Sequence, residues 1–178
     1  PQMKTFFDYD FSIAQHETTC SEFNSLMGMQ LPCEQNELPV TNVTYYDAVL
    51  FANAKSKSER LDTAYLYTAT TFDKDGHCVG MEGFKFDASA NAYRLPTESE
   101  WILVASQGWA PKEAWNAENS NYKVHPVCTA GKNKVNVCDM EGNVSEWVND
   151  WLGRYVDSTV TDYMGAPDGG SVGERVIK

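Results

Sequence analysis

The 178-residue chain is 42% hydrophobic and 12% aromatic, enough apolar material for a folded core, which excludes a disordered polar segment. Its formal net charge of −11 would repel a phosphate backbone, so we expect no nucleic-acid partner. No apolar run approaches the length of a membrane span, so we expect no membrane partner either.

The N-terminal segment FFDYDFSIAQ has an apolar residue at every second position, Phe7, Tyr9, Phe11 and Ile13. This period of two is typical of a strand with one buried face, so we predict a strand here. The chain opens PQMKTFFDYD, with neither an initiator methionine nor an apolar signal segment. We therefore expect a processed chain whose targeting segment lies out of view.

Three helices are predicted where a threonine is followed by an acid three residues later and then by apolar residues at helical spacing. In such a capping box the threonine hydroxyl accepts the third helical N–H, and the acid accepts the N–H of the threonine. Glu98 and Glu100 diverge on the third helix, so we expect capping and ion-pair roles for them rather than a catalytic pair. Aspartate is shorter than glutamate and should make the weaker box. The pairs are Thr19–Glu22, Thr44–Asp47 and Thr97–Glu100.

The segment between the second and third helices predicts a hairpin. A β-rich run is followed by an Asp75-Gly76 turn and a second alternating run with Phe84 and Phe86. The letters DKDG also begin an EF-hand-like pattern, but its twelfth position is Phe84 instead of glutamate, so we interpret it as a turn. After Gly108 the periodicity fades, and loops that long need a metal, a disulfide or aromatic packing to hold them.

The chain has five cysteines, so at least one thiol is free or paired outside the chain. Cys128 and Cys138 flank TAGKNKVNV, which can fold back as a hairpin, and a disulfide between them is favoured over two reduced thiols. Such a bond indicates an extracytoplasmic or secreted location. We expect Cys20 to be a buried, inert thiol of the first helix, while Cys33 and Cys78 are open as bridged or free.

The segment DMEGNVSEW places two carboxylates and a glycine turn within eight residues. Asp139 and Glu146 offer carboxylate oxygens, and the carbonyls of Gly142 and Val144 can point the same way in an extended segment. Calcium takes this mixture of oxygen ligands. From spacing alone, an ordinary turn residue at Asp139 and a hydrogen-bonded core acid at Glu146 explain the pattern equally well.

Four segments, in order, resemble the formylglycine-generating enzyme family, also called the sulfatase-modifying factor family: ETTCSEFNSLMG, LPVTNVTYYDAVLFAN, YRLPTESEWILVAS and CDMEGNVSEWVNDW. The resemblance runs along nearly all of residues 1–178 and implies a single domain. It implies an α+β, irregular C-type-lectin-like fold, low in regular secondary structure and stabilised by calcium. In the family this structural Ca²⁺ is held by the residue at Asp139, the carbonyls at Gly142 and Val144, and the carboxylate at Glu146. A looser match around EAWNAENSNY implies a second site with oxygens from Asn119 and Asn121.

Two departures from the family pattern bear on function. Ser145 stands where the family usually has an aromatic before Glu146, which removes bulk beside the metal loop and the neighbouring groove. The run GERVIK resembles the family segment that continues into two catalytic cysteines, which bind copper(I) and oxidise a substrate cysteine to formylglycine. The chain ends at Lys178, so we expect a domain truncated before that segment, with no catalytic residue among those present.

These expectations leave two classes of function. In the first, the chain is part of a copper-dependent oxidoreductase that acts on a protein or peptide, with Cu⁺ bound only where cysteines follow Lys178. In the second, it is a non-catalytic, calcium-stabilised, lectin-like module that binds a protein or a glycan. A calcium-stabilised domain of unassigned role is the third interpretation.

Overall fold

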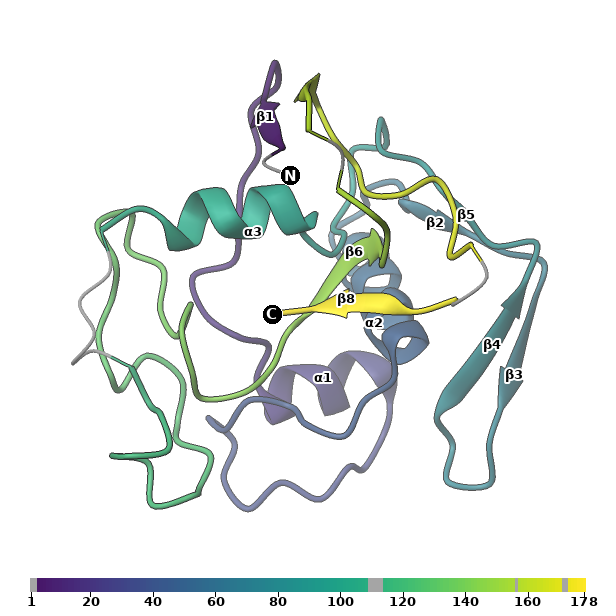
Figure 1. The fold of residues 1–178 in the computed structure, drawn as a ribbon. Coiled ribbons are helices and arrows are strands. Elements are labelled where there is room, and N and C mark those ends of the chain that lie inside the picture. Colours follow the sequence, from purple (N-terminus) through teal and green to yellow (C-terminus); the bar gives the residue numbers. More distant parts are fainter. Residues whose placement is uncertain (1–2, 109–113, 156, 171–172) are drawn as a thin grey trace. The chain divides into compact units, whose positions relative to one another are not determined.

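The computed structural model of the chain describes residues 3–108, 114–155, 157–170 and 173–178. The chain divides into two compact units, one made of Pro1–Glu17 and Pro96–Lys178, the other of Thr18–Leu95. The described strands pair only in twos, as β1–β7, β2–β5, β3–β4 and β6–β8. In chain order the elements are β1 (Lys4–Phe6), α1 (Cys20–Met27), α2 (Tyr45–Ser58), β2 (Tyr65–Leu66), β3 (Ala69–Phe72), β4 (Cys78–Glu82), β5 (Lys85–Phe86), α3 (Glu98–Ala105), β6 (Trp147–Trp151), β7 (Thr159–Thr161) and β8 (Arg175–Ile177) (Figure 1).

All three helices begin at the predicted threonines, and each has a complete capping box. The box made with aspartate is as complete as the other two, because the carboxylate of Asp47 accepts the N–H of Thr44 at 3.0 Å. The same carboxylate also accepts the N–H of Cys78 at 2.8 Å and so ties α2 to β4. A cap of this kind stabilises a helix by about 1 kcal/mol.

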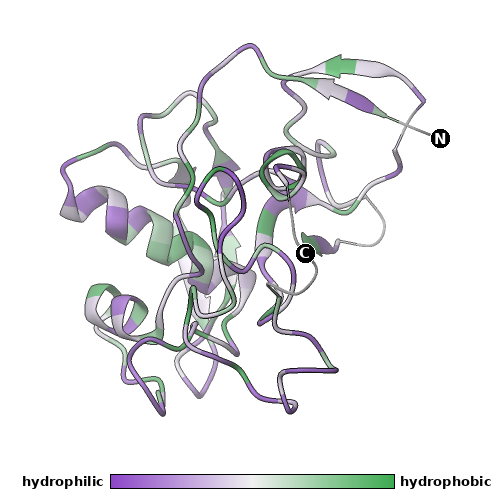
Figure 2. Ribbon diagram, turned by 90° about the vertical axis from the view of Figure 1, so that its left-hand side faces the viewer, coloured by the Kyte–Doolittle hydropathy of each residue, from purple (hydrophilic) through white to green (hydrophobic). Residues whose placement is uncertain are grey.

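The unit Thr18–Leu95 is built on α1 and α2, which pack together through aromatic rings. Phe23 is 1% exposed, and its ring stacks on that of Phe51 with centroids 5.4 Å apart. Both helices carry hydrophobic and hydrophilic bands, as Figure 2 shows by colour. A disulfide joins Cys20 to Cys33, with Cα atoms 6.0 Å apart. The expectation of an inert thiol at Cys20 was therefore wrong.

The predicted hairpin is present as the antiparallel pair β3–β4. At its turn, one carboxylate oxygen of Asp73 accepts the N–H groups of Asp75 and His77, both at 2.9 Å. The carboxylate thus closes its own turn, which confirms the turn interpretation. The second alternating run continues into β5, which pairs with β2 and brings Phe86 beside Tyr65.

The N-terminal strand is shorter than predicted and lies earlier. Among the described residues that precede α1, only β1 is a strand, and it pairs in parallel with β7. The apolar alternation over residues 7–13 still matches alternating burial, but the segment is not a strand. Its side chains instead pack in the core of the unit that contains both termini, where Phe11 and Ile13 contact buried Val104, Val137 and Met140.

In the unit that contains both termini, α3 packs against β6, and β6 pairs with β8. Figure 1 shows these two strands crossing below α3. β8 ends one residue before Lys178, whose backbone exchanges two hydrogen bonds with Glu146, at 2.7 and 2.9 Å. The residues just before β6 are therefore held at the end of a short ladder. None of the helices in the described part has the length and apolar composition that a membrane crossing requires.

Candidate cation loop and the adjoining pocket

Residues 139–146 form an irregular loop that leads into β6. Asp139, Gly142 and Asn143 all have positive φ, at 53°, 104° and 60°. A Cβ atom on Gly142 would lie 2.0 Å from the carbonyl oxygen of Trp115, so only glycine fits there. That same carbonyl accepts the N–H of Asn143 at 2.9 Å. The expected tight turn at Gly142 is therefore present, and the reason is the close approach of another backbone segment.

The two predicted carboxylate ligands lie at the ends of this loop. Asp139 is 2% exposed, and its Oδ2 accepts the N–H of Cys128 at 2.6 Å. Its Oδ1 is buried and has no hydrogen-bond partner among the described residues. Glu146 is partly buried, and its Oε2 accepts the indole N–H of Trp101 at 2.9 Å. Each carboxylate is anchored through one oxygen, which leaves the other without a described partner.

A third carboxylate, which the sequence analysis missed, reaches the loop from far along the chain. Glu17 is 9% exposed. Its Oε2 accepts the side-chain amide of Asn143 at 2.7 Å, and its Oε1 accepts the backbone N–H of Val144 at 3.2 Å. Asn143 also accepts the N–H of His125 at 2.9 Å and donates to its carbonyl oxygen at 3.1 Å. Asn143 is therefore held by the backbone of His125 as well as by Glu17.

Burial raises the pKa values of all three acids, and repulsion between carboxylates adds to the shifts of Glu17 and Glu146. Burial, together with the charges of Asp139 and Glu146, raises the pKa of Glu17 to about 8, against the hydrogen bonds from Asn143 and Val144, which lower it. Burial likewise raises the pKa of Glu146 to about 7, with the charge of Asp139 as a contributor. Burial also raises the pKa of Asp139, against the hydrogen bond from Cys128 and the charge of His16, which lower it. Apart from the charge of His16, which acts on Asp139, no positive charge among the described residues offsets the cluster, and a bound cation would reverse these shifts.

The donor set fits a hard cation. The buried Oδ1 of Asp139 and the carboxylate of Glu146 are oxygen donors, and neither the Gly142 nor the Val144 carbonyl accepts a hydrogen bond from another described residue. Carboxylate and carbonyl oxygens are the ligands that Ca²⁺ prefers. Within the described ranges, no three Asp, Glu, His or Cys side chains gather closely enough to hold a metal by themselves. A cation here would therefore depend on the backbone carbonyls.

The looser second site has less support. Oδ1 of Asn119 accepts the N–H of Asn116 at 2.8 Å, and its amide nitrogen donates to the carbonyl of Ala114 at 2.7 Å. The side chain thus closes its own turn. Asn121 lies two residues on, in the left-handed backbone region at φ 54°.

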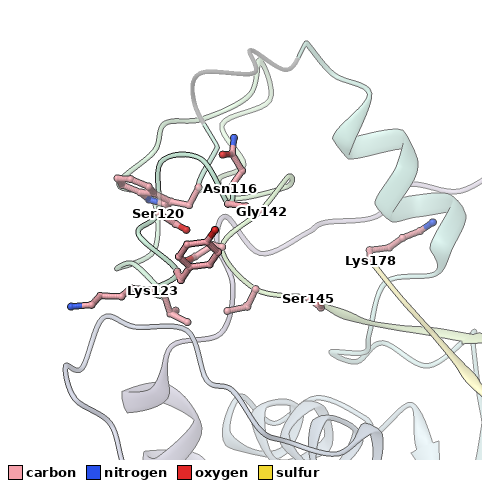
Figure 3. Close-up of a pocket in the computed structure, with 12 residues that line it drawn as sticks. Asn116, Ser120, Lys123, Gly142, Ser145 and Lys178 are labelled. Atoms are coloured by element: carbon pink, nitrogen blue, oxygen red, sulfur yellow. The ribbon is translucent and has the colours of Figure 1, made fainter.

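A pocket of about 390 Å³ adjoins the loop. Ser145 forms part of its wall on the segment that leads into β6, where the expected loss of aromatic bulk leaves open space (Figure 3). The side chain of Lys178 points away from the other labelled residues, because its Nζ pairs with Oε1 of Glu98 at 2.5 Å. Other residues that line the pocket include Trp115, Asn116, Ser120, Tyr122, Lys123 and Asn143.

The pocket combines aromatic and polar surface. The ring of Trp115 stacks on that of His125, with centroids 3.7 Å apart, and its indole N–H donates to the hydroxyl of Thr129 at 3.0 Å. Tyr122 is 90% exposed and has a positive φ of 56°. An exposed aromatic held in an uncommon backbone conformation beside amide and hydroxyl groups is typical of a recognition surface.

The acids of α3 have the structural roles that the sequence predicts. Oε1 of Glu100 accepts the hydroxyl of Tyr9 at 2.8 Å, and Glu100 also closes the capping box. Glu98 pairs with Lys178, and its other carboxylate oxygen accepts the hydroxyl of Tyr155. The N–H of Glu98 donates to Oδ2 of Asp150 at 2.7 Å, so β6 supplies a further cap to α3.

The predicted disulfide between Cys128 and Cys138 is present. With the bond between Cys20 and Cys33, four of the cysteines are oxidised. Cys78 is free and fully buried, and burial raises the pKa of its thiol. The described cysteines therefore offer no pair of reduced thiols of the kind that holds Cu⁺.

Comparisons with known proteins place the chain in a family. The sulfatase-modifying factor enzyme 1-like domain matches residues 1–178. Chaperone protein LppX of Paenibacillus barcinonensis is 31% identical in an alignment 176 positions long that covers 80% of this chain and 62% of that protein. The chain thus spans less than two thirds of that relative's length.

Solved structures agree on the fold. Treponema denticola variable protein 1 superposes with a TM-score of 0.71 at 27% identity, over 91% of this chain and 76% of that chain. The crystal structure of CarF gives a TM-score of 0.62 at 22% identity, over 92% and 78% of the two chains, and at that identity the likeness concerns the fold alone. The chain therefore belongs to the sulfatase-modifying factor enzyme 1-like family, the family of the formylglycine-generating enzymes, and has its irregular α+β, C-type-lectin-like fold.

Proposed function

We propose that this domain is a binding module that recognises a protein segment or a glycan in the pocket beside residues 139–146. The observation that carries this proposal is the open wall at Ser145, which faces a pocket that Tyr122, 90% exposed, also lines. Aromatic faces pack against the apolar faces of sugars and side chains, and nearby amides and hydroxyls bind their polar edges. A family aromatic at position 145 would fill part of this space.

We further propose that the 139–146 loop holds a structural Ca²⁺. Asp139 and Glu146 would supply carboxylate oxygens, and Gly142 and Val144 would supply carbonyls. The orphaned, buried Oδ1 of Asp139 supports this assignment, because a buried charge without a partner is costly. The ion would supply a paired positive charge, since no described Lys, Arg or His forms an ion pair with these acids. Since Gly142, Val144 and Ser145 also line the pocket, the same ion would stiffen the pocket wall.

The binding role is tested by screening the protein, in calcium, against a glycan array and a library of displayed peptides. A ligand of the pocket should be lost when Ser145→Trp fills the space, and weakened when Tyr122→Ala removes the exposed ring. The matched control is Ser25→Trp, on the exposed side of α1 in the other unit, which should bind as the wild type does. Binding that survives Ser145→Trp, or the absence of any ligand in both screens, would overturn the pocket assignment.

Formylglycine formation is the second candidate, and family membership along the whole chain favours it. Its copper(I) chemistry needs two reduced thiols, which the described cysteines do not offer, so the activity would require cysteines outside these 178 residues. The test is oxygen consumption by the full-length protein with copper and a cysteine-containing peptide. Conversion of the peptide cysteine to an aldehyde would establish the oxidase; inactivity of the copper-loaded protein would exclude it for that substrate.

The two disulfides favour an extracytoplasmic location, because such bonds persist in oxidising compartments. A surface-exposed protein or glycan is the kind of partner available there. Mass spectrometry of the protein from its native host, under thiol-blocking conditions, would show whether all four cysteines are bridged in the cell.

A further inference from the structure

Glu17 links two segments of the same unit that are far apart in sequence. Its two carboxylate oxygens accept hydrogen bonds from two consecutive residues of the loop, the side-chain amide of Asn143 at 2.7 Å and the backbone N–H of Val144 at 3.2 Å. A single carboxylate therefore bridges both residues. They lie between Gly142 and Glu146, where the proposed calcium ligands are concentrated.

This contact restricts the loop backbone. A peptide group is planar, so an N–H held at Val144 fixes the plane that also contains the carbonyl of Asn143. The side chain of Asn143 is fixed at the same time by Glu17 and by the backbone of His125. With Gly142 pressed against the carbonyl of Trp115, little rotation is left to the chain between Gly142 and Val144. The N–H of Asn143 donates to the carbonyl of Trp115 at 2.9 Å and so fixes the plane that contains the carbonyl of Gly142. The peptide planes on both sides of Asn143, including that of the Gly142 carbonyl, are therefore set before any ion binds.

Glu17 also adds a third acid to a place where the described residues form no ion pair. Among the described residues, no Lys, Arg or His lies within ion-pair distance of Glu17, Asp139 or Glu146. The nearby ring of His16 uses Nδ1 to donate to the carbonyl oxygen of Glu17 at 2.7 Å. The carboxylate of Glu17 belongs to a residue that is only 9% exposed, so water provides little of the missing compensation.

We propose that Glu17 is a positioning residue for a divalent cation in the 139–146 loop: it holds Asn143 and Val144 in the ligating conformation and contributes negative charge to the site. This inference rests on the proposed cation. It assigns to Glu17 a role in cation affinity and not only in the stability of the fold, and the two roles separate experimentally.

The experiment is calorimetric titration of CaCl₂ into the metal-free protein, with melting curves in chelator, for wild type, Glu17→Gln, Glu17→Asp and Glu22→Gln. Glu17→Gln keeps the size of the side chain but turns one acceptor into a donor that faces another donor, so Ca²⁺ affinity should fall at least tenfold. Glu17→Asp keeps the charge but is too short for both hydrogen bonds, and should lose affinity to a smaller degree. Glu22, which closes the capping box of α1 in the other unit, is the matched control, and its variant should bind Ca²⁺ as the wild type does.

The remaining outcomes distinguish a failure of the cation loop from a failure of the role of Glu17. Wild-type protein that binds no Ca²⁺ overturns the cation loop and, with it, the role of Glu17. Wild-type binding with equal affinity in Glu17→Gln, even with a lower melting temperature in chelator, leaves the loop standing and overturns only Glu17. Should Glu17→Gln fail to fold, the affinity of Glu17→Asp is compared with that of the wild type instead, and equal values overturn the role of Glu17.

Discussion

The backbone N–H of Cys128 donates to Oδ2 of Asp139 at 2.6 Å, and the sulfur of Cys128 is bonded to Cys138, the residue just before Asp139. The disulfide thus holds the donor and the acceptor of this hydrogen bond together. Because Oδ2 of Asp139 is used in this hydrogen bond, Oδ1 is the oxygen that is left without a partner among the described residues. One covalent link therefore orients a residue of the proposed cation site.

Removing this disulfide should weaken both the fold and the cation site. The double variant Cys128→Ser and Cys138→Ser loses a link across 10 residues, a cost of about 2–4 kcal/mol. It should also bind Ca²⁺ more weakly, because Asp139 loses its anchor. The control is the pair Cys20→Ser and Cys33→Ser in the other unit, which should lower the melting temperature with unchanged calcium affinity. Equal affinities in the two double variants would contradict this account.

Chelation should destabilise the protein. With Ca²⁺ at about 100 times its dissociation constant, ligand linkage contributes about 2.7 kcal/mol. In a domain of this size that corresponds to roughly 5–10 °C of melting temperature. Differential scanning calorimetry with and without EDTA measures the shift, and Mg²⁺, which demands a smaller octahedral site, should restore less of it. An identical melting temperature in EDTA, together with the absence of calcium in elemental analysis, would show that the loop holds no structural Ca²⁺.

Gly142→Ala should lower the free energy of unfolding by more than the strain of a positive φ alone explains. Gly142 and Gly76 both have positive φ, at 104° and 88°, but a Cβ atom at Gly76 meets nothing within 4 Å, whereas one at Gly142 meets the carbonyl oxygen of Trp115. Overpacking against a fixed backbone typically costs about 1–3 kcal/mol. Urea denaturation should therefore show Gly142→Ala to be less stable than Gly76→Ala by about that amount. Similar losses in the two variants would show that the backbone of residue 115 moves aside.

Asp150 should make the stability fall as the pH rises through the mildly acidic range. Burial raises its pKa from 3.8 to about 6 in the folded state, with the charges of Glu98 and Glu100 contributing. Because the folded state then binds the proton more tightly than the unfolded state, the contribution is complete below about pH 4 and is lost as the pH rises through 6. The difference in unfolding free energy across this range is about 2–3 kcal/mol.

The variant Asp150→Asn isolates this contribution. It keeps an oxygen that accepts the N–H of Glu98, and it cannot titrate. Chemical denaturation at several values between pH 4 and 7, in chelator, should give a flatter pH dependence for the variant than for the wild type. Parallel curves would mean that the pKa of Asp150 is the same in the folded and unfolded states.

The local features of the fold followed from short-range patterns. Each capping box lies within four residues, so the threonines at 19, 44 and 97 were sufficient to predict where the three helices begin. The bond between Cys128 and Cys138 spans a segment short enough to fold back on itself. The predicted strand over residues 7–13 was wrong, because a strand needs a pairing partner, and alternation shows only that one side of the segment is buried.

The long-range features needed the folded chain. Cys33 meets Cys20 only because the loop after α1 returns to the start of that helix. Glu17 contacts Val144, which lies 127 residues further along the chain. The sequence around Glu17 has no feature that distinguishes this glutamate from the others. Ser145 and Tyr122 line one pocket only because separate loops converge there.

From its sequence alone, the chain could be assigned its family motifs, its helix starts and the oxygen-rich loop between Asp139 and Glu146, because each of these is written in neighbouring residues. Only the tertiary structure decided which oxygens are buried without a partner, that Glu17 completes the loop, and that a pocket opens beside Ser145. Burial and convergence are properties of the whole packed chain, since they depend on which distant segments exclude water from a given side chain.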